Sequence, residues 1–275
     1  MTAERRVLIT GASGTMGRIL LDRPERQGWS YVLFDPVAPE IEGLADRGDI
    51  AVVTGDVSDA QAVASAMQGV TDVVHLGALS VEDYWEDILR VNIGGTRNLL
   101  EAAAAQGVGR FVFASSNHAV GCYTPSDAGP AGLADDAEAR PDTYYGWSKA
   151  AGEDLLRLYC ERTQMRGVVI RIGHCFPEPL TGPRLPFWLS PRDARALLDA
   201  CLENDIAPFQ TVWGSSANTR SWLSLEGGKK IGFVSADDSE QFVDRFPADS
   251  IAIDPDGPLG AHFVSVPLGV PMRTR

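Results

Sequence analysis

Tyr145 and Lys149, four residues apart, are the side chains in this sequence best suited to proton transfer. On a helix, residues at this spacing lie one turn apart on the same face. A free phenol titrates near ~10 and is a poor base at neutral pH, but a nearby ammonium favours the phenolate and lowers that pKa. The pair can therefore take a proton from a substrate hydroxyl. So short a motif also fits a tyrosine packed under a lysine stem, so its interpretation depends on the preceding chain.

Three evenly spaced glycines follow the first apolar segment. The run Arg5–Thr10 predicts a parallel strand buried on both faces, and residues 15–27 predict a helix. Gly11 and Gly14 lie between the strand and the helix, and Gly17 lies in the first turn of the helix. This order of strand, glycine loop and helix is typical of dinucleotide-binding proteins. We expect Gly11 to permit the tight turn and Gly14 to let a pyrophosphate approach the backbone. Gly17 would let the helix pack close to the sheet.

An acidic residue, Asp35, ends the second predicted strand, about 20 residues beyond the glycine loop, where an acid can accept hydrogen bonds from an adenosine ribose. Because a carboxylate would repel a 2′-phosphate, this position favours NAD over NADP. A helix cap or a solvated loop acid is the alternative interpretation of Asp35. The other residues expected to bind the cofactor are Thr15, Met16, Asp56, Val57, Leu76, Gly77, Ala78 and Asn92, together with Tyr145 and Lys149.

Two further polar residues have structural interpretations. His75 stands near the end of a predicted strand and is more typical of a packed histidine than of a catalyst. Asn92 lies in a helical segment, where a buried amide can tie a helix to a loop through side-chain hydrogen bonds.

Strand and helix patterns alternate over the first 172 residues, which predicts parallel crossovers and a doubly wound parallel sheet of the Rossmann α/β type. Ligands bind such sheets beyond the carboxyl ends of the strands. We expect an NAD-binding domain over 1–172, completed by a strand near 208–213, and a small substrate-binding part with a surface-wrapping tail over 173–275. The other expected strands are 31–35, 50–54, 72–78, 110–114 and 166–172, and the other expected helices are 60–67, 87–105, 145–163, 191–203 and 239–246.

Composition limits the classes of partner. A formal net charge of −13 over 275 residues argues against nucleic acid, because phosphate binding needs a basic face. Four widely spaced cysteines and the lack of a signal peptide predict a cytoplasmic protein with reduced thiols. No apolar run is long enough to span a bilayer, so no membrane partner is expected. The histidines lack metal-ligand spacing, so no metal is expected either.

Taken together, the glycine loop, Ser116 and the Tyr145-x-x-x-Lys149 pair resemble the extended short-chain dehydrogenase/reductase family. The resemblance is closer to the uronate dehydrogenases within that family and covers most of the chain. The stretches that carry it are HLGALSVE at 75–82, FASSNH at 113–118, YGWSK at 145–149, RIGHCFPEP at 171–179 and VWGSSAN at 212–218. It implies NAD-dependent oxidation of the anomeric C1 of cyclic galacturonate or glucuronate to an aldarolactone.

The resemblance also implies a role for each site residue. Tyr145 would be the base on O1, Lys149 would lower its pKa and bind the nicotinamide ribose, and Ser116 would hold the reacting oxygen. Arg184 would bind the C6 carboxylate, whose planar geometry suits a guanidinium fork; an ordinary surface position is the alternative for this arginine. The remaining implied sugar contacts are Ser80, Asn117, His118 and His174.

One substrate-contact position departs from that group. The uronate dehydrogenases usually carry serine after Arg-Ile-Gly in this segment, whereas this chain carries His174. An imidazole is bulkier and can be charged near neutral pH. It could narrow the pocket, change the preferred uronate epimer, or move the substrate to another sugar or sugar acid.

Two other classes compete with this interpretation. A nucleotide-sugar epimerase or dehydratase of the same superfamily would need room for a larger substrate, and the segment after residue 172 is short for that. A non-catalytic NAD-sensing regulator would have no need for Tyr145, Lys149 and Ser116, all of which are present. Relatives of the family commonly self-associate, so a homo-oligomer acting on a small sugar acid is the expected form.

Overall fold

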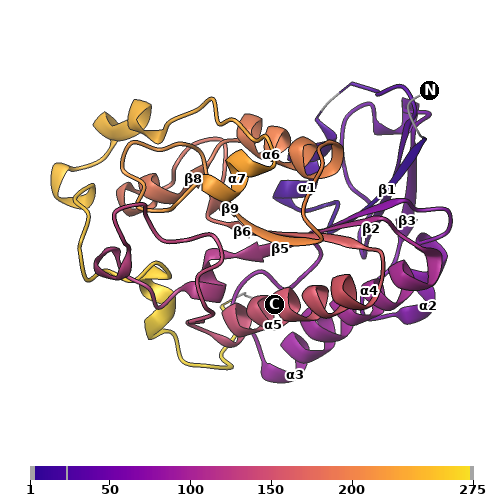
Figure 1. Ribbon diagram of the computed structural model, residues 1–275, viewed down its shortest axis with the longest axis horizontal. Coiled ribbons are helices and arrows are strands. Elements are labelled where there is room, and N and C mark those ends of the chain that lie inside the picture. The colour runs from indigo at the N-terminus through magenta and orange to yellow at the C-terminus, as the bar shows by residue number, and fades with distance from the viewer. Residues whose placement is uncertain (1–3, 23, 273–275) are drawn as a thin grey trace.

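Seven parallel strands form the main sheet of the computed structural model, which describes residues 4–22 and 24–272 (Figure 1). They lie in the order β3-β2-β1-β4-β5-β6-β9, and every neighbouring pair is parallel. The chain therefore starts in the middle of the sheet and builds outward in both directions, which confirms the predicted doubly wound fold. The strands are β1 Arg5–Thr10, β2 Trp29–Asp35, β3 Ile50–Thr54, β4 Asp72–His75, β5 Arg110–Ser116, β6 Arg166–Ile172 and β9 Phe209–Gly214.

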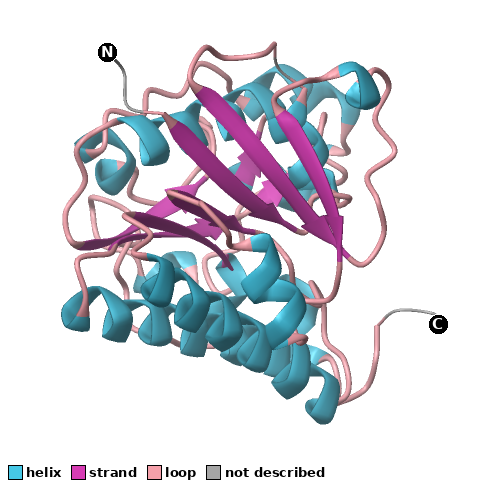
Figure 2. Ribbon diagram, turned by 90° about the vertical axis from the view of Figure 1, so that its right-hand side faces the viewer, coloured by secondary structure: helices cyan, strands magenta, loops and turns pink. Residues whose placement is uncertain are grey.

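Helices cover both faces of this sheet (Figure 2). Successive side chains of a strand point to opposite faces. In β1, Val7 and Ile9 pack into the core beneath α1 (Thr15–Leu21) and α6 (Pro191–Glu203). Leu8 packs into the core on the other face, beneath α2 (Ala60–Ala66), α4 (Gly95–Gln106) and α5 (Tyr144–Arg162). Burial on both faces explains why the strand is an uninterrupted apolar run.

Two helices differ from the sequence prediction. Helix α1 ends at Leu21 and does not reach residue 27. Pro24 follows shortly after; it lacks an amide donor and disfavours the helical conformation in the residue before it. The helix expected over 87–105 is α3, a π-helical turn and α4 in succession. The helices are α2 Ala60–Ala66, α3 Trp85–Asp87, the π-helical segment Ile88–Gly94, α4 Gly95–Gln106, α5 Tyr144–Arg162 and α7 Glu226–Lys230.

The chain beyond β6 forms small elements around the carboxyl edge of the sheet. A two-stranded parallel pair, β7 (His174–Cys175) with β8 (Trp188–Leu189), precedes α6. Short 3-10 helices occur both in this part and earlier in the chain. They are Leu44–Asp46, Asn117–Val120, Pro125–Asp127, Gly182–Phe187, Ser239–Arg245, Ala248–Ser250 and Ala261–Ser265.

Over the described residues, every helix is too short or too polar to cross a membrane. The four cysteines are free thiols.

Candidate active site

The glycine loop after β1 lies in direct contact with the loop after β4. Gly11 has a φ of +68°, and a Cβ on it would lie 2.7 Å from the amide nitrogen of Gly77. A Cβ on Gly17 would lie 2.3 Å from the carbonyl oxygen of Ala12, so α1 packs close to the start of the loop. Side chains at these glycines would therefore clash with backbone. Gly11 and Gly17 thus pack against other backbone, while Gly14 between them is exposed at the carboxyl edge of the sheet, an arrangement typical of a dinucleotide-binding loop.

Asp35 is fixed beside this loop. Its carboxylate accepts the amides of Ser13 at 3.1 Å and of Val37 at 3.1 Å. A carboxylate has about four lone-pair directions, so Asp35 can still accept bonds from a ribose diol. Asp56 lies near the start of the loop after β3 and accepts the amide of Ser58 at 2.8 Å. Asp35 is the last residue of β2 and Asp56 follows β3 by two residues, so both acids lie at the carboxyl edge of the sheet.

Tyr145 and Lys149 share the first turns of α5. Thr143 caps this helix by accepting the amide of Gly146 at 3.0 Å. The buried Lys149 ammonium donates to the carbonyl oxygen of Ala114 at 2.8 Å and lies 5.9 Å from the centre of the Tyr145 ring. Burial lowers the pKa of Lys149 to about 8, while the charge of Glu153 acts to raise it. A desolvated ammonium thus lies against the tyrosine, as the motif predicts.

The polar residues after β5 are held against the start of α5. Ser116 accepts the amide of His118 at 3.2 Å and donates to the side-chain oxygen of Asn117 at 3.2 Å. A Cβ on Gly146 would lie 2.3 Å from the carbonyl oxygen of His118, so the glycine inside the Tyr-x-x-x-Lys motif permits this close approach. The His118 ring lies 5.8 Å from the Tyr145 ring, centre to centre. Ser116, Asn117 and His118 therefore adjoin the proposed base.

Asn92 uses its whole amide group within the protein. It donates to the carbonyl oxygen of Leu79 at 3.1 Å and to Ser148 Oγ at 2.8 Å, and it accepts the amide of Leu79 at 2.8 Å. These bonds join the loop after β4 to helix α5. That loop contains Leu76, Gly77, Ala78 and Ser80, so Asn92 helps to fix the position of these residues relative to helix α5 and Tyr145.

His75 is packed in the core, as the sequence predicts. Its ring lies between the hydroxyls of Thr10, 2.7 Å from Nδ1, and Thr96, 3.0 Å from Nε2. Burial, with a smaller contribution from Lys149, lowers its pKa to about 3. The ring is therefore neutral at physiological pH and positions the ends of β1 and β4.

This neutral histidine should make the fold sensitive to acid. The stability linked to His75 is complete above its unfolded pKa of 6.5 and is lost as pH falls toward the folded value of about 3. We expect the free energy of unfolding to fall by up to about 1.4 kcal/mol per pH unit over this window. Urea titrations at several pH values should show a shallower dependence in His75→Gln. An unchanged slope would contradict the assignment.

Arg184 and His174 lie on separate elements of the small C-terminal part. Arg184 is half-buried in the 3-10 helix Gly182–Phe187 and makes no ion pair or side-chain hydrogen bond with any residue in 4–22 or 24–272. Burial first, and then the nearby charges of Arg184, His118 and His262, lower the pKa of His174 to about 3. Within the described part of the chain, the Arg184 guanidinium therefore has no counter-ion and lies near His174, although the protein carries a net charge of −13.

Two buried carboxylates beside the site escape the sequence patterns. Asp142 accepts a hydrogen bond from Nδ1 of His118 at 2.6 Å, and its side chain is fully buried. Glu82 is also fully buried and accepts the backbone amide of Tyr145 at 2.9 Å. Glu82 ends the stretch HLGALSVE, which is the only signal that the sequence offers for it.

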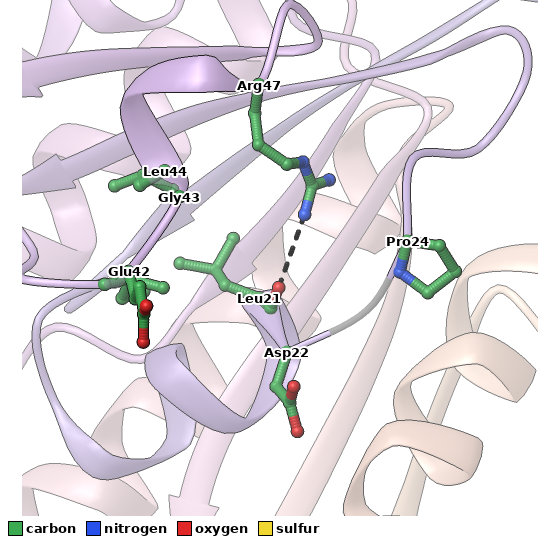
Figure 3. Close-up of a pocket in the computed structure, with 8 residues that line it drawn as sticks. Leu21, Asp22, Pro24, Glu42, Gly43, Leu44 and Arg47 are labelled. Carbon is green, nitrogen blue, oxygen red and sulfur yellow. Dashed lines mark hydrogen bonds between the residues drawn. The ribbon is translucent and has the colours of Figure 1, made fainter.

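A separate surface hollow of about 490 Å³ lies at the far end of α1 from the glycine loop (Figure 3). Leu21, Pro24 and Leu44 contribute to its lining, and Arg47 bonds to the carbonyl oxygen of Leu21 at 3.4 Å. None of the predicted site residues lines this hollow.

The strand order, the glycine loop after β1 and the Tyr-x-x-x-Lys helix together define a dinucleotide-binding enzyme of the extended short-chain dehydrogenase type. The model of the NAD dependent epimerase/dehydratase family matches residues 7–226, and the chain belongs to this family. It is an NAD-dependent oxidoreductase, which confirms the cofactor and the class inferred from the sequence.

Similar proteins of known name span nearly the whole chain. Uronate dehydrogenase of Pseudomonas syringae pv. tomato is 34% identical over 98% of this chain and 96% of its own length. An NAD-dependent glucose-6-phosphate dehydrogenase of Haloferax volcanii is 35% identical over 87% of this chain and 96% of its own length. The crystal structure of a mutant uronate dehydrogenase from Agrobacterium tumefaciens complexed with NAD has a TM-score of 0.85 at 34% identity, covering 96% of this chain and 98% of that one.

Proposed function

We propose that this enzyme oxidises the anomeric C1 of a cyclic uronic acid, galacturonate or glucuronate, to an aldarolactone. The observation that carries the proposal is the buried Lys149 ammonium 5.9 Å from the ring centre of Tyr145, on a helix that begins at the carboxyl edge of the sheet. An ammonium in this position favours the phenolate. The uronate dehydrogenase relatives, similar over the full chain, support the substrate class.

The residues that would hold NAD fit its chemistry. The bare backbone around Gly11 and Gly14 would receive the pyrophosphate, and Asp35 would accept the ribose hydroxyls. Lys149 would bind the nicotinamide ribose. When bound, the nicotinamide accepts a hydride. The remaining residues proposed to contact the cofactor are Thr15, Met16, Gly17, Asp56, Val57, Leu76, Gly77 and Ala78.

Side chains of the protein would accept the substrate proton and stabilise the developing carbonyl group. Tyr145, as phenolate, takes the proton from O1 while the C1–H bond breaks and its electron pair leaves with the hydrogen. C1 then becomes the carbonyl carbon of the lactone. Ser116 would turn its hydroxyl hydrogen from Asn117 Oδ1, 3.2 Å away, to the reacting oxygen and so hold the sugar beside Tyr145. Hydrogen bonds placed where charge changes in the transition state are usually the largest protein contribution.

The other end of the sugar would be held by charge. Arg184 has no counter-ion among the described residues, so a C6 carboxylate would complete its pairing. Ser80, Asn117 and His118 would contact the ring hydroxyls. Asp142, bonded to Nδ1 of His118 at 2.6 Å, would hold that imidazole in one orientation.

A second candidate is oxidation of another anionic sugar at the same carbon. His174 lies close enough to Arg184 for the guanidinium charge to lower the pKa of the imidazole. The imidazole therefore takes up space beside the proposed anion site. One relative, matched over 87% of this chain, is named an NAD-dependent glucose-6-phosphate dehydrogenase, and glucose 6-phosphate also carries its anion on C6.

A substrate panel tests both candidates. NADH formation should be followed at fixed enzyme with galacturonate, glucuronate, glucose 6-phosphate, glucose and galactose, each with NAD and with NADP. The proposal expects the highest kcat/KM for a uronate with NAD. A higher value for glucose 6-phosphate would favour the second candidate, and a higher value for a neutral hexose would refute both.

Replacement of His174 by serine is expected to change sugar preference. Removing the imidazole enlarges the pocket beside Arg184, and shape differences of this size change discrimination roughly 10-fold or more. The ratio of kcat/KM for galacturonate to that for glucuronate should therefore shift by about that factor, with the disfavoured epimer gaining. The Kd for NAD should not change. An unaltered ratio would remove His174 from the substrate pocket.

A further inference from the structure

Glu82 connects three segments that are distant in the sequence. Its side chain is fully buried, with Oε2 accepting the amide of Tyr145 at 2.9 Å and Oε1 accepting the amide of Gly269 at 2.7 Å. Its own carbonyl oxygen accepts the amide of Met272 at 3.0 Å. One residue of the loop after β4 thus bonds to the start of α5 and, twice, to the C-terminal tail.

The bond to Tyr145 occupies a special position on α5. The first amides of a helix have no partner inside the helix. Tyr145 is the second residue of α5, and Thr143 already satisfies the third, Gly146. A carboxylate at a helix N-terminus is also favoured by the helix dipole. Glu82 therefore holds the backbone of the very residue that carries the proposed base.

The bond to Gly269 fixes the tail near the site. Upstream, the tail pairs with the loop after β5, since Leu259 and Gly260 donate to the carbonyl oxygens of Tyr123 and Gly121 at 2.7 and 2.8 Å. The ring of Phe263 then stacks on His118 at a centre-to-centre distance of 4.0 Å. Downstream of this contact, the yellow tail in Figure 1 returns to the start of α5.

The loop that carries Glu82 is itself immobilised. Both the amide and the carbonyl of Leu79 are bonded to Asn92, at 2.8 and 3.1 Å. Glu82 is three residues further along and is fully excluded from solvent. Because these contacts restrain the loop, the Glu82 carboxylate keeps its position independently of the tail. It therefore serves as a fixed acceptor for the amides of both the tail and α5.

We propose that Glu82 is a positioning residue that fixes the Tyr145 phenol through its backbone, and that the tail, through Gly269, completes this arrangement. The inference rests on the proposed function, in which Tyr145 is the base. A carboxylate suits the position because both of its oxygens accept bonds, one from each segment. Glutamine has one acceptor oxygen, and its NH₂ group would oppose one of the two amide donors.

The primary test is Glu82→Gln in the full-length enzyme. We expect kcat with the best uronate to fall about 10- to 100-fold, the size of effect that a small misplacement of a reacting group produces. The Kd for NAD, measured by fluorescence, should stay within about twofold of wild type, because the cofactor contacts of the same loop, Leu76 to Ala78, precede Leu79, which is held by Asn92 and not by Glu82. Glu86→Gln, an exposed glutamate in the same segment, is the matched control and should leave kcat unchanged.

A second variant tests the tail and does not depend on Glu82 folding correctly when changed. Gly269 has a φ of +73°, which a β-branched residue adopts only under strain, so Gly269→Val should displace the amide that Glu82 accepts. Gly43→Val is its control, since Gly43 has a φ of +71° and open space around it. We expect Gly269→Val to lower kcat by about the same factor as Glu82→Gln, and the double variant to lose little more.

The outcomes separate this inference from the function on which it rests. Tyr145→Phe belongs in the same panel. If it remains active, the proposed function fails, whatever Glu82 does. If Tyr145→Phe is inactive while Gly269→Val retains wild-type kcat, the coupling of the tail to the site is wrong. A fall in kcat that is multiplicative in the double variant would also overturn it, because independent effects would then explain both losses.

Discussion

Replacement of Tyr145 by phenylalanine should lower kcat by about 10³-fold or more while the Kd for NAD stays within about twofold. The substitution removes one oxygen atom from a buried ring and leaves the aromatic packing against His118 in place. General base catalysis by a positioned side chain is worth about 10² to 10⁴ in rate. The fall in kcat should exceed that expected for losing one hydrogen bond, because the phenolic oxygen would also stabilise the developing carbonyl oxygen.

The neighbouring residue provides the control for this experiment. Tyr144 precedes the proposed base on α5, and its ring packs on Trp85 at 4.8 Å, centre to centre. Tyr144→Phe makes the identical chemical change one position away and should keep kcat within about twofold, as surface substitutions away from a site do. Rates should be measured by stopped-flow formation of NADH at saturating uronate. Turnover by Tyr145→Phe at the rate of Tyr144→Phe would remove the phenol from the mechanism.

The sheet and its carboxyl edge are predictable because local patterns encode them. Val7, Leu8 and Ile9 are at most 2% exposed, so a strand covered on both faces must be apolar throughout. The glycine loop is equally local, since each glycine there avoids a clash with backbone that is near in sequence or in the adjoining loop. Once the strands are parallel, their carboxyl ends meet, and Gly11, Asp35 and Ser116 come to the same edge without further information.

Contacts made by the tail and by buried carboxylates are not predictable in this way. Glu82 and Gly269 are separated by 187 residues, and no periodicity relates them. Asp142 lies in a loop rich in glycine and proline, where the sequence does not distinguish an acid that orients His118 from one that faces solvent. These features require the three-dimensional contacts themselves. The early end of α1 at Leu21 differs, because Pro24 is a local signal for it in the sequence.

The charge distribution indicates what an acidic chain would need in order to hold the proposed acidic substrate. With a net charge of −13, long-range attraction for an anion is absent, and binding must come from contacts inside the site. Burial keeps His174 neutral at physiological pH, with a pKa of about 3, so it offers hydrogen bonds and bulk but no charge there. That leaves Arg184 as the residue expected to supply positive charge at the anion end of the sugar.

Replacement of Arg184 by alanine should therefore raise KM for uronates by about 100-fold, with a smaller change in kcat. Two charge-assisted hydrogen bonds to one carboxylate are worth about 1.5–3 kcal/mol each, part of which water recovers in the variant. The binding is made equally in the ground state and the transition state, so KM carries most of the effect. The KM of Arg184→Lys should lie between those of the wild type and Arg184→Ala, because lysine keeps the positive charge but lacks the planar guanidinium fork.

Neutral sugars provide the internal control for the Arg184 variants. Any residual turnover of glucose or galactose should be unaffected by Arg184→Ala, since these substrates have no carboxylate to lose. Arg192→Ala, at an exposed arginine paired with Asp237 at 3.0 Å, should leave all kinetic constants near wild type. If Arg184→Ala weakened uronate and neutral sugar alike, its role would be to shape the pocket, and the carboxylate would have to bind elsewhere.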